Sequence, residues 1–287
     1  MSLENLNSQL HTVQDIQLNT LLEIKNKHQS FLYAFAALEI NNILSTNLHL
    51  DVANSSALNA FLSISPESGL FLYCLPIKDL NLVMNNREFQ MVLLHYLGLR
   101  IYANHSPCNI CLNASNDPMG IHALRCHGHG NLSIRHDHLK LTLDAIGKEC
   151  GVSSETETKN LLQDERRPAD VFFRMFSSGK DLAIDLACID TSIGNRPPSE
   201  VLEAKAQEKN DSYLADLEAV GIKFTPFIMS LFGVFHKDAL DLVSVLSTRW
   251  ASRNDVLVSV ARCRIIQRLS FCLRRIIGAE LVARDVV

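Results

Sequence analysis

Long apolar runs are missing from this sequence of 287 residues. The longest apolar stretch, residues 224–235, is interrupted by Pro226, Ser230 and Gly233, and it is shorter than the roughly 20 residues that a membrane-spanning helix needs. The first residues also lack the basic segment and the apolar core of a secretory signal. We therefore expect an intracellular protein without a membrane-spanning helix, whose eight cysteines do not form a disulfide framework.

A strong excess of charge of one sign is also missing. The 27 Lys and Arg residues face 31 Asp and Glu residues, so the net charge is −4. This excludes nucleic-acid binding over the whole surface, because such binding needs many cations to neutralise phosphates. Locally, residues 256–278 contain five arginines and no acid. They form either an arginine-rich solvated helix face or a phosphate-binding surface, and only the second predicts strongly salt-dependent binding.

The hydrophobic fraction of 47% suffices for one large or two modest domains with a buried core. Residues 1–62 carry apolar side chains at helical spacing, such as Leu18, Leu21 and Leu22, and a further helix is expected over residues 87–99. The pattern predicts a mostly helical N-terminal region over residues 1–104, and no residue up to about 62 suggests chemistry.

Histidine and cysteine are concentrated between residues 105 and 138. Two cysteines three residues apart precede a His/Cys pair four residues apart: Cys108, Cys111, His122 and Cys126. Such spacing builds tetrahedral zinc sites in segments with little core of their own. We predict a zinc knuckle over residues 105–134, with a structural Zn²⁺ because protein ligands fill all four positions. The alternatives are His127 or His129 as substitute ligands, or buried cysteines without a metal.

A β-hairpin is expected with its turn at residues 178–179 and its strands over residues 167–173 and 182–189. A hairpin centred there makes Asp170 and Asp185 diagonal neighbours on one open face, where they can share a cation. The opposite face, which we expect in the core, carries Val171, Phe173, Met175, Leu182, Ile184, Leu186 and Cys188.

A helix beginning at Ser199 is expected next, with Lys205, Lys209 and Tyr213 at intervals of four residues along one ridge. A lysine beside two aspartates suits phosphodiester hydrolysis, in which Mg²⁺ activates water and an ammonium group holds the nucleophile or offsets charge. Ordinary surface charge on a solvated helix explains the same residues without any activity, and the spacing leaves both interpretations open.

Taken in order, these motifs resemble the restriction-like endonuclease of site-specific non-LTR retrotransposons, a branch of the PD-(D/E)xK nuclease superfamily. In that family a CCHC knuckle precedes an Arg-His pair, an RPD or RPAD strand, a second aspartate strand and a lysine displaced onto the next helix. Besides the knuckle, the matching residues are Arg135-His136, Arg167-Pro168-Ala169-Asp170, Asp185 and Lys209. The resemblance covers roughly residues 65–275.

The resemblance implies an α/β (α+β) fold. Residues 135–236 would form a restriction-endonuclease-like core with a mixed sheet flanked by helices. The helical region and the knuckle would precede this core, and a basic helical tail over residues 237–287 would follow it.

The resemblance also implies cleavage of a DNA strand. Mg²⁺ or Mn²⁺ would be held by Asp170 and Asp185, assisted by Lys209, with Glu157 as a further acid on an earlier element. The resemblance further implies a nuclear protein. It implies contacts to DNA, or to the RNA of a retroelement, by six residues: Arg135, His136, Lys205, Arg262, Arg264 and Arg268.

The sequence departs from the family pattern at two positions. Ala187 stands where a standard superfamily member carries its lysine, and Ala206 stands where the family often has an acid one turn before the displaced lysine, with Glu203 or Glu208 as alternatives. No polymerase signature occurs, so the chain is not a complete reverse transcriptase. A catalytically inactive nucleic-acid-binding or interaction protein is therefore an alternative, and a zinc-stabilised protein without a nucleic-acid partner is another.

Overall fold

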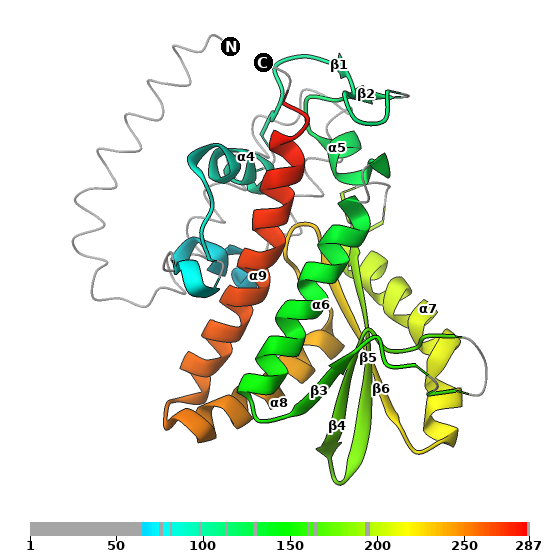
Figure 1. Ribbon diagram of the computed structural model, residues 1–287. Helices are drawn as coiled ribbons and strands as arrows, with labels where there is room; N and C mark the ends of the chain where they lie inside the picture. The colour runs from blue at the N-terminus through cyan, green and yellow to red at the C-terminus, as the bar shows by residue number, and fades with distance from the viewer. Residues whose placement is uncertain are drawn as a thin grey trace. The chain divides into compact units, whose positions relative to one another are not determined.

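The computed structural model describes residues 65–74, 77–80, 82–97, 99–112, 114–128, 131–159, 161–162, 166–192 and 196–285. These residues belong to one compact unit, Ala53–Val287 (Figure 1). The helices expected over residues 1–62 lie outside the described residues. Among the helices that are described, none has the length and apolar character needed to cross a membrane.

The described part of the chain has a mixed α/β fold. In chain order its elements are η3 (Pro66–Tyr73), η4 (Lys78–Leu80), α4 (Asn86–Tyr96), β1 (Ser106–Pro107), β2 (Ser115–Asn116), α5 (Ile121–Arg125), α6 (Asn131–Glu149), β3 (Ser153–Thr156), β4 (Val171–Ser177), β5 (Lys180–Ile189), α7 (Pro198–Ala219), β6 (Lys223–Ser230), α8 (Lys237–Asn254) and α9 (Val258–Val282).

Strands β3, β4, β5 and β6 form one sheet in that order. The β3–β4 and β4–β5 pairs are antiparallel, whereas β5 and β6 are parallel. A parallel pair needs a crossover connection, which helix α7 supplies. The predicted mixed α/β class with a mixed sheet is confirmed.

The turn of the β4–β5 hairpin lies where the sequence predicts it. Ser178 and Gly179 have positive φ angles of 52° and 75°, and two such residues form the tight turn whose twist matches that of paired strands. Ser177 pairs with Lys180 across this turn.

A β-bulge interrupts strand β4 beyond this turn. The register shifts between Phe173 and Ser177, and Met175 within the bulge has a φ of 49° and is 69% exposed. The prediction that Met175 lies in the core is therefore wrong, because a bulge breaks the strict alternation of side chains. The remaining residues predicted for that face are buried or half-buried in the main core: Val171, Phe173, Leu182, Ile184, Leu186 and Cys188.

The bulge also changes the expected pairing of the two aspartates. Val171 pairs with Ile184, and the backbone N–H of Asp170 donates to the carbonyl oxygen of Ile184 at 2.9 Å. With Val171 opposite Ile184, Ala187 does not stand opposite Asp170 as the prediction required. The carboxyl groups of Asp170 and Asp185 nevertheless lie within hydrogen-bonding reach of each other.

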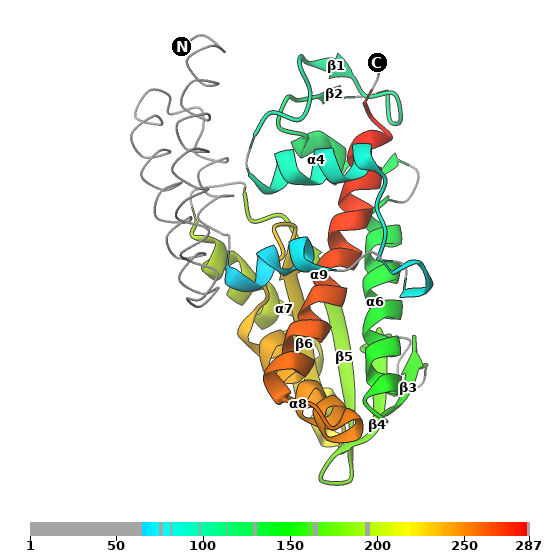
Figure 2. The same cartoon turned by 90° about the vertical axis from the view of Figure 1, so that its left-hand side faces the viewer.

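Helices cover both faces of the sheet, with α6 and α8 packed on one side and α7 on the other (Figures 1 and 2). Under α7, Phe172 and Ala183 are buried with Leu217 in a second hydrophobic cluster. The expectation of an open aspartate face is therefore wrong, and Asp185 is only 6% exposed.

Helix α9 packs against α4, α6 and α8 (Figure 2). Its residues Ile265, Leu269, Leu273 and Ile277 are buried in the same hydrophobic core as the strands. Residues 237–287, expected as a basic tail, thus complete the main core, and the proposed boundary at residue 236 does not separate two cores.

Because α9 lies in the core, part of the arginine-rich segment over residues 256–278 is buried, as Arg274 shows. Its side chain is completely buried, donates to the carbonyl oxygen of Phe232 at 2.6 Å, and lies about 5 Å from the ring centres of Phe71 and Tyr96. Burial lowers the pKa of Arg274 to about 10, so the guanidinium remains charged at neutral pH. It links the N-terminal part of the described chain to the core.

Candidate functional site

The four predicted zinc ligands come together. Their ligand atoms all lie within 4.8 Å of one another, with 4.0 Å between the Sγ atoms of Cys108 and Cys126 and 3.4 Å from Cys111 Sγ to His122 Nε2. A tetrahedral zinc ion with Zn–S bonds of about 2.3 Å requires ligand atoms about 3.8 Å apart. The cluster can therefore hold a metal ion such as zinc.

Local structure explains how a short segment builds this cluster. The β1–β2 hairpin carries the first two cysteines, and α5 carries the histidine. The carboxylate of Asp117 accepts hydrogen bonds from the backbone N–H groups of Ile121 and His122 at the start of that helix. Gly120 has a φ of 74°, and a Cβ there would lie 2.9 Å from side-chain atoms of Ile101 and Leu281, so glycine is required.

The electrostatics favour a thiolate at Cys108. Burial raises the pKa of this thiol, but hydrogen bonds from the backbone N–H groups of Cys111 and Ile110, with the side chain of His122, lower it to about 6. Thiolates are the form that binds zinc. His127 is exposed and lies outside the cluster, and His129 lies outside the described residues.

The knuckle is joined to the core through Arg135, for which the resemblance implied a nucleic-acid contact. Arg135 is 2% exposed. Its Nη2 donates to the carbonyl oxygen of Leu124 at 2.8 Å and to Glu280 Oε2 at 2.6 Å. The side chain is therefore buried between α5, α6 and α9, and in this structure it is not placed to contact a phosphate.

The second group of predicted residues converges at the centre of the sheet. Asp170 precedes β4, Asp185 lies within β5, and Lys209 reaches them from α7. Lys209 Nζ is 2.7 Å from Asp185 Oδ2, an ion pair without the angles of a hydrogen bond. Lys205, the alternative lysine, pairs instead with Glu208 on its own helix at 2.5 Å.

The two carboxyl groups differ in their electrostatics. Burial raises the pKa of Asp185 to about 7, against the lowering effect of Lys209 and with a further increase from Asp170. For Asp170, burial also raises the pKa, but the hydrogen bond and charge of His136 outweigh it, so the pKa lies below its usual value. Asp170 is therefore the more acidic member of the pair.

His136 is the partner of Asp170, although the resemblance had implied a nucleic-acid contact for it. Its Nε2 lies 3.0 Å from Asp170 Oδ2. One turn further along α6, Lys140 is ion-paired with Asp137 and Glu157. Lys140 and Asp137 were not predicted, although the spacing of four residues between His136 and Lys140 would have indicated that both lie on one helix face.

Glu157 lies at the rim of this arrangement. Its side chain is 51% exposed and is paired with Lys140, while its backbone N–H donates to the carbonyl oxygen of Asp170 at 3.0 Å. Glu157 thus stabilises the start of β4 through its backbone, while its carboxylate is paired with Lys140 and Arg167.

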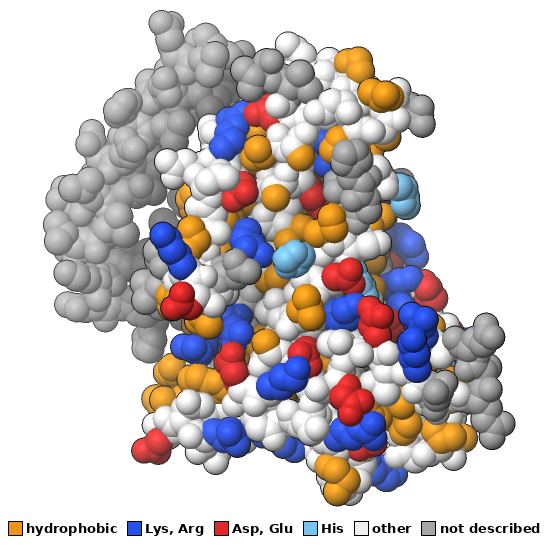
Figure 3. Space-filling model, in the orientation of Figure 1, with side chains coloured by type: hydrophobic (Ala, Val, Ile, Leu, Met, Phe, Trp, Pro, Cys, Tyr) orange, Lys and Arg blue, Asp and Glu red, His pale blue; other side chains and the backbone are white. Residues whose placement is uncertain are grey.

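The three arginines of α9 that were predicted to contact nucleic acid make contacts within the protein. Arg268 is 9% exposed and pairs with Glu149 at 2.6 Å; Arg264 lies over the ring of Trp250; and Arg262 donates to Ser244. On the face shown in Figure 3, basic and acidic side chains are interspersed and do not gather into a basic patch.

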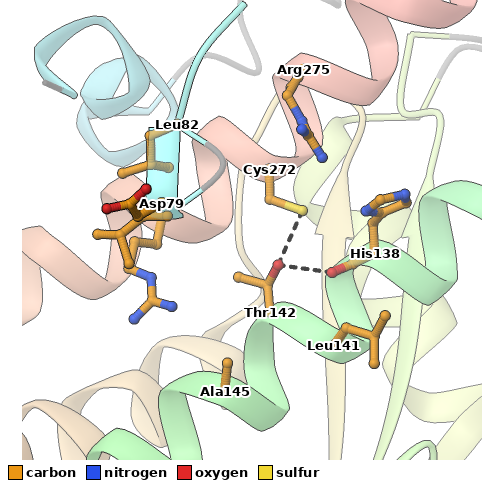
Figure 4. Close-up of a pocket in the computed structure, with 10 residues that line it drawn as sticks. Asp79, Leu82, His138, Leu141, Thr142, Ala145, Cys272 and Arg275 are labelled. Atoms are coloured by element: carbon orange, nitrogen blue, oxygen red, sulfur yellow. Dashed lines mark hydrogen bonds between the residues drawn. The ribbon is translucent and has the colours of Figure 1, made fainter. Parts of the chain in front are cut away.

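A separate cavity of about 350 Å³ lies between η4, α6 and α9 (Figure 4). Its lining includes His138, Thr142, Arg268 and Cys272. Thr142 Oγ1 donates to the carbonyl oxygen of His138 at 2.8 Å and to Cys272 Sγ at 3.2 Å. Residues two apart on a helix point about 200° apart, so His136 and His138 serve different sides of α6.

No family model matches the chain, and none of the curated proteins is significantly similar to it.

Proposed function

We propose that this protein is a metal-dependent DNA endonuclease with a restriction-endonuclease-like core, related to the nuclease region of site-specific non-LTR retrotransposons. The observation that carries the proposal is the convergence of Asp170, Asp185 and Lys209, which come from three separate elements. Charged side chains that serve only solubility lie at the surface and are rarely buried together, whereas buried clusters of charged groups are typical of functional sites.

The order of elements around the site supports the proposal. Asp170 directly precedes strand β4, Asp185 lies on the adjacent strand β5 of the same hairpin, and the lysine lies on the helix that follows. This is the arrangement that the resemblance implies, with the lysine displaced from the strand position of Ala187. Helices flank the mixed sheet on both sides, as expected of such a core.

The donor set fits a hard divalent cation. Carboxylate oxygens are the ligands that Mg²⁺ and Mn²⁺ prefer. Asp185 carries a raised pKa because its negative charge is buried beside that of Asp170, and a divalent cation would offset both charges. When bound, such an ion lowers the pKa of water and stabilises the charge that develops on a phosphate.

Lys209 has the properties of a charge-stabilising group. Burial lowers its pKa, but the ion pair with Asp185 raises it above the usual value. The side chain therefore remains an ammonium group at neutral pH, suited to donate to a phosphate oxygen or to hold an attacking water. Asp170 and Asp185 orient it through charge.

Nicking of supercoiled plasmid DNA in the presence of Mn²⁺ or Mg²⁺ tests the proposal. We expect Asp170→Asn, Asp185→Asn and Lys209→Met each to lower the nicking rate by about 100-fold or more. Lys148→Met is the matched control, because Lys148 also pairs with an aspartate at 2.7 Å but on the exposed side of α6.

The outcomes separate the candidate functions. Nicking that survives both aspartate substitutions would refute the assigned site. Salt-sensitive DNA binding without any nicking would identify a catalytically inactive binding protein, and the absence of both activities would leave a zinc-stabilised protein without a nucleic-acid role.

A further inference from the structure

The carboxylate of Asp170 is held by two donors that act on the same oxygen atom. His136 Nε2 lies 3.0 Å from Asp170 Oδ2, and the backbone N–H of Leu186 donates to that oxygen at 2.6 Å. No N–H group of the described residues donates to the other oxygen, Oδ1. The hydrogen bonds thus distinguish the two oxygens of one carboxylate.

The two donors belong to different elements, since His136 lies on α6 and Leu186 lies on β5. One hydrogen bond would leave the carboxylate able to rotate about its side-chain bonds. Two donors that reach one oxygen from a helix and from a strand fix both its position and its orientation. Oδ1 then has no N–H donor among the described residues, and a cation can replace the proton through which Asp185 shares a hydrogen bond with Asp170.

Helix α6 is a rigid support for His136. The neighbouring Arg135 is anchored to Glu280 and to the backbone of Leu124, and Leu139 and Leu143 of the same helix are buried in the main core. Side chains mounted on a buried helix hold a ligand more accurately than side chains on a loop.

We infer that His136 is a positioning residue, which holds the Asp170 carboxylate through Oδ2 and leaves Oδ1 for a divalent cation shared with Asp185. This inference rests on the proposed nuclease function. It assigns His136 a role different from the nucleic-acid contact implied by the resemblance, because the ring nitrogen closest to the site is already bonded to Asp170.

Calorimetric titration of the zinc-loaded protein with Mn²⁺, in the absence of DNA, tests the inference. His136→Phe keeps an aromatic ring but removes the donor, and His136→Gln keeps an N–H donor at similar reach. We expect the Phe variant to bind Mn²⁺ about 10-fold or more weakly, as for other residues that orient metal ligands, and the Gln variant to recover most of the loss.

His138→Phe is the matched control, because His138 lies two residues further along α6 and lines the separate cavity (Figure 4). Its Mn²⁺ affinity is expected to stay within about 2-fold of the wild type, since it orients no proposed ligand. Zinc content and thermal unfolding verify that each variant is folded. If the Phe variant fails to fold, His136→Ala replaces it, because the smaller side chain cannot clash.

Equal Mn²⁺ affinity of the wild type and the folded His136→Phe or His136→Ala variant would overturn the positioning role and leave the nuclease proposal intact. A loss of affinity that Gln does not restore would also overturn it, since the hydrogen bond would then not be the cause. Mn²⁺ binding that is absent, or unchanged by Asp185→Asn, would instead refute the proposed cation site.

Discussion

The knuckle and the carboxylate site are assembled in opposite ways. All four knuckle ligands lie within residues 108–126, and one hairpin and one short helix bring them together. Asp170, Asp185 and Lys209 come from the start of one strand, the middle of the next and a helix on one face of the sheet. A local site can therefore form as soon as its metal binds, whereas the distant site needs the complete fold.

The two sites also differ in how many ligand positions the protein fills. Three cysteines and a histidine would complete the tetrahedron of a zinc ion at the knuckle, which would leave no position for a substrate. Two carboxylates would leave most positions of a divalent cation to water or to phosphate. The knuckle is therefore suited to stabilise the fold, and the carboxylate site is suited to the proposed hydrolysis.

The largest effect is expected from loss of the knuckle metal. Structural zinc contributes on the order of 10 kcal/mol in isolated zinc-finger peptides. Chelation of the metal, or Cys126→Ala, should unfold the knuckle and lower the melting temperature by on the order of 10 °C. Metal analysis combined with scanning calorimetry measures both. A chain without one equivalent of zinc, or with an unchanged transition, would contradict a structural metal site.

The next largest effect concerns the link between the two regions. Arg135→Ala would leave the buried carboxylate of Glu280 without its partner, at a cost of about 3–5 kcal/mol. The double variant Arg135→Met, Glu280→Leu should recover much of this loss, because it removes both buried charges. Urea unfolding measures the difference. If Arg135→Ala weakened DNA binding and left stability unchanged, the residue would be a phosphate contact after all.

In the metal-free protein, the carboxylate site should make the free energy of unfolding depend on pH. The pKa of Asp185 is raised to about 7 by burial, against Lys209 and with the charge of Asp170, whereas in the unfolded chain it is near 3.9. The folded chain therefore keeps a proton that the unfolded chain releases. The resulting stability is complete below about pH 4 and is lost as the pH rises through about 7.

The comparison of wild type with Asp185→Asn isolates this effect. Between pH 5 and pH 8 the wild type should lose on the order of 2 kcal/mol of unfolding free energy relative to the variant, and Mn²⁺ should reduce the loss. Urea denaturation at both pH values provides the measurement. Parallel pH profiles of the two proteins would show that Asp185 does not titrate in this range.

The smallest effect concerns the bulge that determines the register of the aspartates. Met175 has a φ of 49° and an exposed side chain, and a non-glycine residue in this conformation is strained. Met175→Gly should therefore stabilise the fold by up to about 1 kcal/mol, and a shift of the melting temperature would reveal it. Destabilisation would mean that the exposed side chain makes a needed contact.

The sequence by itself determined the features that depend on neighbours along the chain. The Cys/His spacing, the turn at Ser178 and Gly179, and the helical ridge that carries Lys209 are all local patterns, because a turn, a knuckle and a helix face each involve only nearby residues. These predictions are confirmed as structure, while the nuclease activity remains a proposal.

Only the tertiary structure decided which charged side chains are buried or bonded within the protein and therefore cannot contact a ligand. The arginine-rich residues 256–278 were expected to form an exposed helix face. Arg274 is nevertheless fully buried and Arg268 nearly so, because α9 packs against other elements on most of its sides. The register of β4 against β5, beside which Asp170 and Asp185 lie, depends on a bulge. The bond from Asp170 to His136 depends on helix α6, which comes from another part of the chain. Burial and long-range contacts arise from packing, which local spacing does not encode.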